Sequence, residues 1–380
     1  MSGNTEKSRR ARRSMFYPKA DLQISDDRLQ FLRRPDEPQT LAAYCEGLSI
    51  AVGKMLAELG TSARIVDIAA LPEQGTFHRI FRVRLDDERR IIARVALQTP
   101  ALQSSPTTDA DHSLLIDAWA HDRLRRAGLS GLQIFTVDVS RRTVPFAYEL
   151  LAEAPGRSLR DFDHDDAQMQ PLLTDLGRRL AQMHVLRGVG AGLMAVEQVA
   201  PQSEPAVRGS HDAWPDYVLT QLDAHLAACR DLGAVDAIEV RRIESLFAST
   251  QSLAGDAPLV LLHGDLGNHN IFTDGERITQ LIDWEDCLYG DPVFDLAFWA
   301  TFHPERRHEW LLSGYREFVP LEAVDERRFH LYFLRIALAK TVLRNRLGIV
   351  DVPGRTPASQ RIQHALAALG RGKSSGAHAA

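Results

Sequence analysis

The pattern of apolar and polar positions changes twice along the chain. Between positions 40 and 59, apolar residues recur every three or four positions, which predicts a helix that ends before Gly60. Between positions 64 and 97 the period falls to two, which predicts antiparallel strands with one buried face. After Pro155-Gly156 the helical period returns, for example in the apolar stripe of residues 172–183. We therefore expect a sheet-containing part followed by a mainly helical part.

The strand pattern sets one basic residue apart. Apolar side chains alternate with basic ones over positions 81–85, and an acidic turn at 86–88 leads into a second strand over 90–97. Ile91, Ala93 and Val95 share one face of that strand, so Arg94 points to the opposite face. A helix over 114–127 and strands over 132–137 and 146–151 complete the pattern of an α+β unit.

The second half of the chain contains helices and one β-hairpin. The apolar spacing predicts helices at 212–232, 234–253, 321–346 and 357–369. Strands at 270–273 and 278–282 flank Asp274-Gly275, which is a strong hairpin signal. We divide the chain into a basic arm at 1–20, an N-terminal lobe at 38–150, a C-terminal lobe at 151–369 and a tail at 370–380. The arm and the tail are expected to be disordered.

Composition excludes several classes of protein. The 380 residues are 44% apolar and 25% charged, which is typical of a globular protein, and the net charge is −5. A general nucleic-acid binder is not expected, because such proteins present a basic face. No apolar run is long enough to span a membrane, and no apolar segment of a secretory signal follows the basic N-terminus. The three cysteines, Cys45, Cys229 and Cys287, are expected to be reduced thiols in a cytoplasmic protein.

The segment 261–300 carries the candidate chemistry. His263-Gly264-Asp265 precedes a tight loop, Asn270 follows five residues after Asp265, and Asp283 lies eighteen residues after Asp265. The predicted hairpin between Asn270 and Asp283 brings these three oxygen-bearing side chains together. Mg²⁺ prefers such carboxylate and amide oxygens and keeps several water and phosphate ligands. The alternative, a turn and a solvated acidic loop, is disfavoured because the acids adjoin apolar strands, where an unpaired charge is costly.

Two stretches of this segment resemble a known family. HGDLGNHN and IDWEDCLYGDPVFDLA are similar to the catalytic loop and metal-binding segment of the aminoglycoside phosphotransferases and the related choline kinases. The resemblance extends more weakly over residues 40–350. It implies a bilobal, protein-kinase-like α+β fold, with a small antiparallel-sheet lobe and a larger, mainly helical C-terminal lobe.

The resemblance also implies a role for individual residues. Asp265 would be the catalytic base, and Asn270 and Asp283 would hold Mg²⁺. Arg94 would bind nucleotide phosphates, with Asp117 as its acidic partner. The remaining implied nucleotide contacts are Gly75 and Thr76 in the loop over the phosphates and the backbones of Leu151 and Glu153 at adenine. Asp291 and Asp295 would brace the catalytic loop, and His263 and His184 would be structural.

The acceptor is expected to be a small molecule. A protein kinase is disfavoured, because only seven residues separate Asp283 from Asp291 and leave little room for a peptide platform. From position 151 onward the chain has 31 acidic and 23 basic residues. Acidic residues such as Asp161, Glu285 and Asp286 would attract a polycationic aminoglycoside, although they would equally serve solubility.

We therefore expect a Mg²⁺-dependent O-phosphotransferase that uses ATP or GTP and acts on an aminoglycoside or a related glycosylated or nucleoside antibiotic, with resistance as the outcome. The alternatives are a metabolic kinase of choline, a sugar or another small alcohol, and a catalytically silent binding module. A monomer and a dimer are both compatible with the sequence.

Overall fold

The structure is a computed structural model that describes residues 37–72, 78–97, 109–162, 165–197, 206–248, 258–321, 323–349 and 357–371. The chain forms two units. Unit 2 contains Asp27–Gly156 and Thr279–Glu285, and unit 1 contains Met1–Asp26, Arg157–Ile278 and Asp286–Ala380. The chain passes from unit 1 to unit 2 within β11 (Ile278–Leu281). The short stretch Thr279–Glu285 groups with unit 2, whereas the division predicted from sequence places it in the C-terminal lobe at 151–369.

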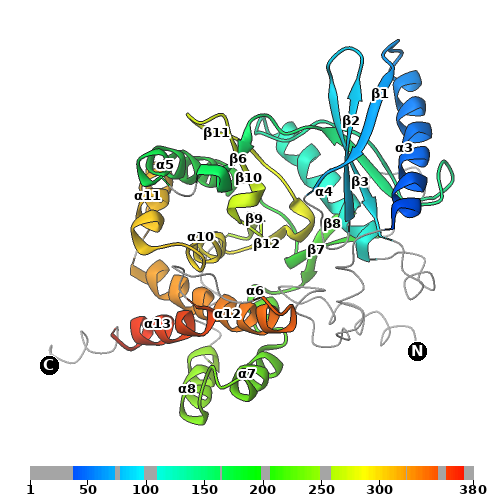
Figure 1. The fold of residues 1–380 in the computed structure, drawn as a ribbon. Coiled ribbons are helices and arrows are strands. Elements are labelled where there is room, and N and C mark those ends of the chain that lie inside the picture. Colours follow the sequence, from blue (N-terminus) through cyan, green and yellow to red (C-terminus); the bar gives the residue numbers. More distant parts are fainter. Residues whose placement is uncertain are drawn as a thin grey trace, which may run out of the picture. The chain divides into compact units, whose positions relative to one another are not determined.

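Unit 2 is a five-stranded antiparallel sheet with helices packed against it. Its elements are α3 (Pro38–Glu58), β1 (Ile65–Ala70), β2 (His78–Leu85), β3 (Arg90–Ala96), α4 (Asp109–Arg126), β4 (Ile134–Asp138) and β5 (Tyr148–Ala152). The strand order is β1-β2-β3-β5-β4, and every neighbouring pair is antiparallel. Figure 1 shows α3 lying alongside β1–β3. The elements predicted here from the change of period are therefore confirmed.

The two faces of this sheet have different partners. Leu48, Val52 and Leu56 of α3 pack against Phe81, Val83, Ile91, Ala93 and Val95 in one buried apolar cluster. Residues of β3 alternate between the faces, so Arg94 points away from α3. It lies directly opposite Glu149 of β5 in the strand register. The strand alternation therefore places a cation and a carboxylate side by side on the face away from the core under α3.

Unit 1 is mainly helical with short strands. Its elements begin with β6 (Arg157–Ser158), η1 (Leu159–Phe162), α5 (Asp166–Met183), β7 (Ala191–Glu197), β8 (Ala206–His211), α6 (Trp214–Val218), α7 (Leu222–Asp231), α8 (Ala237–Ala248) and β9 (Val260–Leu262). They continue with η2 (Asn268–Asn270), β10 (Ile271–Thr273), β12 (Leu288–Gly290), α10 (Val293–Ala300), α11 (Glu305–Arg316), α12 (Ala323–Arg346) and α13 (Ala358–Arg371). A turn η3 (Trp284–Asp286) follows β11. The strands form the orders β11-β10-β6 and β8-β7-β12-β9.

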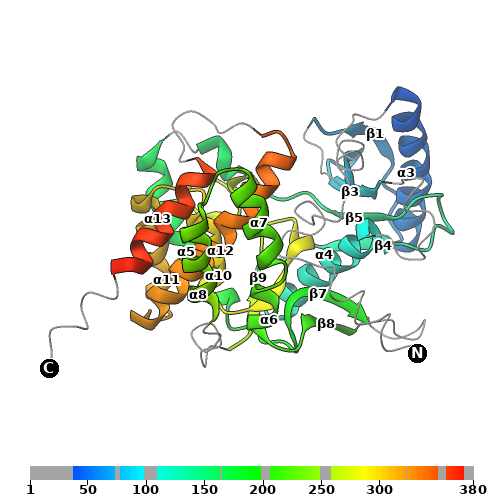
Figure 2. The ribbon, with the colours of Figure 1, turned by 90° about the horizontal axis from the view of Figure 1, so that it is seen from below.

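The helices of unit 1 pack closely in pairs. In Figure 2, α13 lies along α12, and the two helices are in contact. Helices α5 and α11 approach so closely that a Cβ atom on Gly177 would overlap the carbonyl oxygen of Leu311. A Cβ atom on Gly314 would likewise overlap the carbonyl oxygen of Thr174. Glycine is therefore required where these two backbones meet.

Four sequence predictions for unit 1 need correction. The helix predicted at 212–232 is interrupted, because Gln221 adopts a left-handed conformation (φ 58°) between α6 and α7. The hairpin at Asp274-Gly275 is present, but the prediction of a single β insert is wrong, since β7, β8, β9 and β12 form a second sheet. The prediction also lacked α10 and α11. Gly370 and Arg371 belong to α13 and not to a disordered tail, and the predicted arm at 1–20 lies outside the described residues.

None of the helices in the described ranges is both long and apolar enough to cross a membrane.

Candidate active site

The catalytic loop predicted from sequence starts directly after β9 and is braced by α10. Gly264 has φ 80°, and a Cβ atom there would overlap the carbonyl oxygen of Asp286. The carboxylate of Asp295 accepts hydrogen bonds from the backbone N–H of His263 (2.7 Å) and of Gly264 (3.0 Å). Asp295 is fully buried, so these bonds also satisfy a charge that would otherwise be costly. The predicted bracing role of Asp295 is confirmed.

The other residues predicted to support this loop also have internal partners. The N–H of Asp265 donates to Nδ1 of His263 at 3.3 Å, and His184 lies 2.9 Å from the hydroxyl of Tyr315 and 3.6 Å from Asp295. Asp291 accepts from the N–H of Val293 at the start of α10, and also from Tyr332 and Arg328 at 2.8 Å each. Each of these residues is therefore held by internal contacts, which is compatible with the structural role predicted for it.

Asp265 and Asn270 lie together in this loop. The side-chain amide of Asn270 donates to the carbonyl oxygen of Asp265 at 3.0 Å, and it lies 3.5 Å from Oδ2 of the Asp265 carboxylate. Because the amide nitrogen faces Asp265, the amide oxygen points in another direction. The Asp265 side chain is 24% exposed, so its carboxylate is in contact with solvent.

One residue near Asp265 was missed by the sequence analysis. Lys340, on α12, places its ammonium nitrogen 3.6 Å from Oδ1 of Asp265. No sequence motif links the two residues, and only the packing of α12 brings the lysine to the loop.

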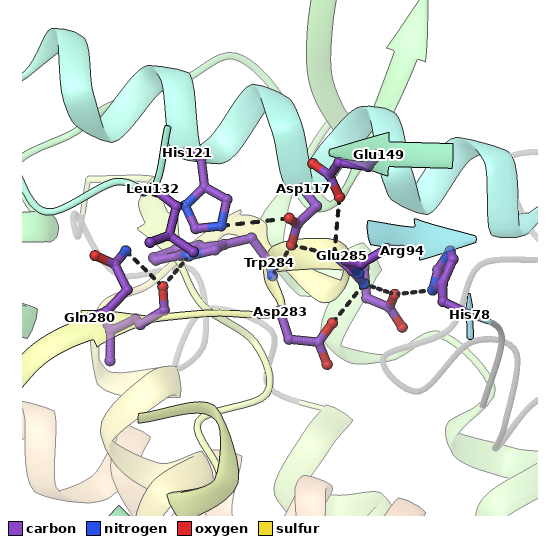
Figure 3. Close-up of polar contacts among 11 residues, drawn as sticks. His78, Arg94, Asp117, His121, Leu132, Glu149, Gln280, Asp283, Trp284 and Glu285 are labelled. Atoms are coloured by element: carbon purple, nitrogen blue, oxygen red, sulfur yellow. Dashed lines mark hydrogen bonds and ion pairs between the residues drawn. The ribbon is translucent and has the colours of Figure 1, made fainter. Parts of the chain in front are cut away.

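In unit 2, four carboxylates surround Arg94 (Figure 3). One guanidinium nitrogen lies 2.8 Å from Asp117 and 3.5 Å from Glu149, and the other lies 2.8 Å from both Asp283 and Glu285. The ion pair expected between Arg94 and Asp117 is therefore present. Asp117 also accepts the backbone N–H of Trp284 at 2.6 Å, which ties the segment around Asp283 to α4.

The ionisable groups of this cluster have pKa values shifted in different directions. Burial raises the pKa of Glu149 well above its usual value, and the neighbouring Asp117 adds to the increase, so the protonated form of Glu149 is favoured in the folded protein. Burial would also raise the pKa of Asp117, but the charges of Arg94 and His121 outweigh it and hold that pKa low. Burial alone would lower the pKa of Arg94, but the surrounding carboxylates raise it well above its usual value. Arg94 is therefore a permanent cation, and Asp117, with its low pKa, is its ionised partner.

Asp283 and Glu285 differ in their surroundings. Asp283 adopts a left-handed backbone conformation (φ 66°), and its side chain is 37% exposed. Glu285 is only 11% exposed, and it bridges Arg94 and His78, which lies 3.0 Å away. The sequence predicts that Glu285 contacts the acceptor, but its carboxylate has two partners within unit 2.

The remaining predicted residues are dispersed. Asp161 is exposed in η1, and Asp286 is partly buried at the end of η3. Leu151 lies inside the sheet opposite Ile92 of β3 and Ile134 of β4. Glu153 follows β5, where its carboxylate forms an ion pair with Arg82 at 2.5 Å and lies 3.7 Å from Arg90. Gly75 and Thr76 lie outside the described residues.

The three predicted oxygen-bearing side chains are divided between the units. Asp265 and Asn270 belong to unit 1, and Asp283 belongs to unit 2, so their convergence stays a prediction. Within the described residues, no three His, Cys, Asp or Glu side chains are grouped as a metal site. The donor types still fit Mg²⁺, which binds through one or two protein oxygens together with water and phosphate.

Comparisons with known proteins agree on one family. The model of the phosphotransferase enzyme family, APH, matches residues 69–330. A hygromycin-B 4-O-kinase from Escherichia coli is 29% identical over 146 residues, which are 34% of this chain. The match spans only 38% of that relative's length.

Solved structures share the fold at low identity. A thermostable mutant of aminoglycoside phosphotransferase APH(4)-Ia, in a ternary complex with AMP-PNP and hygromycin B, has a TM-score of 0.56 at 19% identity. The similarity covers 86% of this chain and 99% of that one. A fructosamine-3-kinase homologue from Thermobifida fusca has a TM-score of 0.55 at 20% identity, over 83% of this chain and 98% of that one.

Proposed function

Because the chain belongs to the phosphotransferase enzyme family, APH, we propose that it transfers the γ-phosphoryl group of ATP to a hydroxyl group of a small molecule. The observation that carries the proposal is the loop in which Asp295 fixes the backbone before Asp265 and Asn270 adjoins Asp265. A silent binding module has no need for an accessible carboxylate on such a braced loop.

Unit 2 supplies the candidate nucleotide contacts. Arg94 is held in place by Asp117 and keeps its charge at all working pH values. A planar guanidinium binds phosphate oxygens through two parallel hydrogen bonds. In the proposed function, the nucleotide phosphates replace part of the carboxylate shell of Arg94, and Asp283 and Glu285 are the carboxylates that give way.

Asp265 is the proposed proton acceptor. The oxygen of the acceptor hydroxyl attacks the γ-phosphorus, the bond from that phosphorus to the bridging oxygen breaks, and ADP leaves. The hydroxyl proton passes to the Asp265 carboxylate. Such transfers proceed through a loose transition state, so Asp265 both orients the hydroxyl and receives its proton.

Asn270 and Asp283 are proposed to hold Mg²⁺, which when bound would neutralise charge on the phosphate oxygens. The amide oxygen of Asn270, turned away from Asp265, and the half-exposed carboxylate of Asp283 supply suitable donors.

For the acceptor we propose an aminoglycoside of the hygromycin B type, with antibiotic resistance as the consequence. The partial identity to the hygromycin-B 4-O-kinase and the acidic composition after position 150 support this choice. Fructosamine-3-kinase homologues match the fold equally well, so the fold itself does not select the acceptor, and sugars and choline belong in the test.

A substrate screen tests the proposal. The purified chain is incubated with Mg²⁺, ATP or GTP, and one acceptor at a time: hygromycin B, other aminoglycosides, nucleoside antibiotics, a fructosamine, sugars or choline. Mass spectrometry then detects the addition of one phosphoryl group. We expect transfer from ATP to hygromycin B or a related aminoglycoside. Nucleotide binding without transfer to any acceptor would contradict the proposal.

A further inference from the structure

Lys340 of α12 places its ammonium group beside the carboxylate of Asp265, the predicted catalytic base. Its nitrogen lies 3.6 Å from Oδ1 of Asp265, and the two side chains are 13% and 24% exposed. Both residues belong to unit 1, so the contact lies within one unit. A partly buried pair of this kind is screened less by solvent than an ion pair on the surface.

The position of Lys340 is fixed by its surroundings. Its ammonium lies over the ring of Phe298 at 4.8 Å and over the ring of Phe302 at 5.5 Å. Phe298 is buried within α10, and α10 packs along α12. Five residues earlier on α12, the buried Arg335 donates to the carbonyl oxygens of Val218 and Thr220 at 2.7 and 2.6 Å. These contacts restrain both α12 and the Lys340 side chain, and they therefore keep the ammonium near Asp265.

We propose that Lys340 is a positioning residue for Asp265, an inference that rests on the function proposed above. Lys340 faces Oδ1 of the carboxylate, and the amide of Asn270 lies on the side of Oδ2. With a partner at each oxygen, rotation of the carboxylate is restricted, and one lone-pair direction is presented to the acceptor hydroxyl. Such orientation contributes to the rate without a new bond to the substrate.

The charge of Lys340 fits this step. Its ammonium attracts the Asp265 carboxylate, so the contact at Oδ1 is retained while a hydroxyl group approaches the carboxylate. Because the base must orient that hydroxyl in a loose transition state, this restraint bears directly on the rate of transfer.

Substitution of Lys340 tests the proposal, with steady-state kinetics on the acceptor found in the screen. In Lys340→Met the charge is lost and the length is kept, and kcat should fall about 10- to 100-fold. The KM for ATP should stay within about two-fold, since the lysine acts on Asp265 and not on nucleotide binding. Lys340→Arg should recover most of kcat, because the positive charge returns. Arg346→Met, which removes a cation from the same helix, should keep the wild-type kcat.

A double-mutant cycle separates positioning from a merely structural role. If Lys340 acts through Asp265, the variant carrying both Lys340→Met and Asp265→Asn should be no slower than Asp265→Asn alone. Multiplicative losses in the double variant would overturn the proposal, as would a wild-type kcat in Lys340→Met. A thermal unfolding scan of each variant shows whether a loss of activity follows a loss of folded protein, and a loss of activity that Lys340→Arg does not recover also counts against the proposal.

If the wild-type chain phosphorylates no acceptor, the proposed function fails and Lys340 loses its role with it. A wild-type enzyme that is active and insensitive to Lys340→Met refutes only the inference about Lys340.

Discussion

The loop around Asp265 and the cluster around Arg94 hold their charged groups in different ways. In the loop, backbone N–H groups, one amide and one lysine hold two separate carboxylates, Asp295 and Asp265. In the cluster, a single buried arginine faces four carboxyl groups, and burial raises the pKa of one of them, Glu149, well above its usual value. The loop is organised chiefly by hydrogen bonds, and the cluster by compensation of buried charge. Substitutions in the loop should therefore lower the rate of phosphoryl transfer. Substitutions in the cluster should also change the stability of the folded protein.

The largest effect is expected for Asp265→Asn. The amide keeps the shape of the side chain but accepts no proton, so kcat should fall about 10²- to 10⁴-fold. Because Asp265 is partly exposed and does not brace the loop, the urea midpoint should change little. Steady-state kinetics and urea unfolding of the same preparation check both expectations. Unchanged turnover would remove Asp265 from the reaction.

Arg94→Met should reduce stability strongly. It leaves Asp117, Asp283 and Glu285 without their common cation, and removal of one partner of a buried ion pair costs about 3–5 kcal/mol. Nucleotide binding should also weaken. Arg84→Met is the matched control, because Arg84 forms an exposed ion pair with Asp67 on the same sheet. Equal stability of the two variants, measured by urea unfolding, would contradict the charge-compensation account.

Unlike Arg94→Met, Glu149→Gln should increase the stability of the folded protein relative to wild type as the pH rises. The pKa of Glu149 is raised in the folded protein, so folding retains a proton that the unfolded chain releases above the ordinary value of 4.5. Wild-type stability should therefore fall as the pH rises from 4.5 towards the raised pKa, and Glu149→Gln should lack this loss. The low pKa of Asp117 affects stability in a different pH range. Ionised Asp117 stabilises the folded protein, and this stabilisation is lost only as the pH falls below 3.8. Urea unfolding at about pH 5 and about pH 8 measures the difference. A variant that is less stable than wild type at the higher pH would refute this assignment of the proton.

The smallest effect is expected for Phe302→Leu. It removes one of the two rings near Lys340 and leaves the buried Phe298 in place. A partly exposed cation–π contact contributes about 0.5–1 kcal/mol, so kcat should fall about two- to five-fold. A loss as large as that of Lys340→Met would mean that the ring has a role of its own.

The sequence predicted the elements whose signals are local. The two-residue period of β2 and β3 placed Arg94 on the face away from α3, and the spacing from His263 to Asn270 placed Asp265 beside Asn270. Asp274-Gly275 marked the turn between β10 and β11. In each case neighbouring residues determine the geometry, so the pattern is sufficient.

The features that were missed depend on contacts between distant segments. The pairing of Arg94 with Glu149 requires β5 to lie next to β3, which no local pattern specifies. The strands β9 and β12 have three residues each, too few to show a period. Lys340 reaches Asp265 only through the packing of α12, and its own sequence context is that of an ordinary buried helix.

The central claim is that Asp265 receives the acceptor proton during phosphoryl transfer. A single-turnover measurement tests it most directly: enzyme in excess over labelled ATP is mixed with a saturating acceptor, and phosphorylated product is followed by rapid quench. We predict rapid product formation by the wild-type enzyme. For Asp265→Asn we predict product formation slowed by at least about two orders of magnitude with unchanged ATP binding. Equal single-turnover rates for the two proteins would contradict the claim.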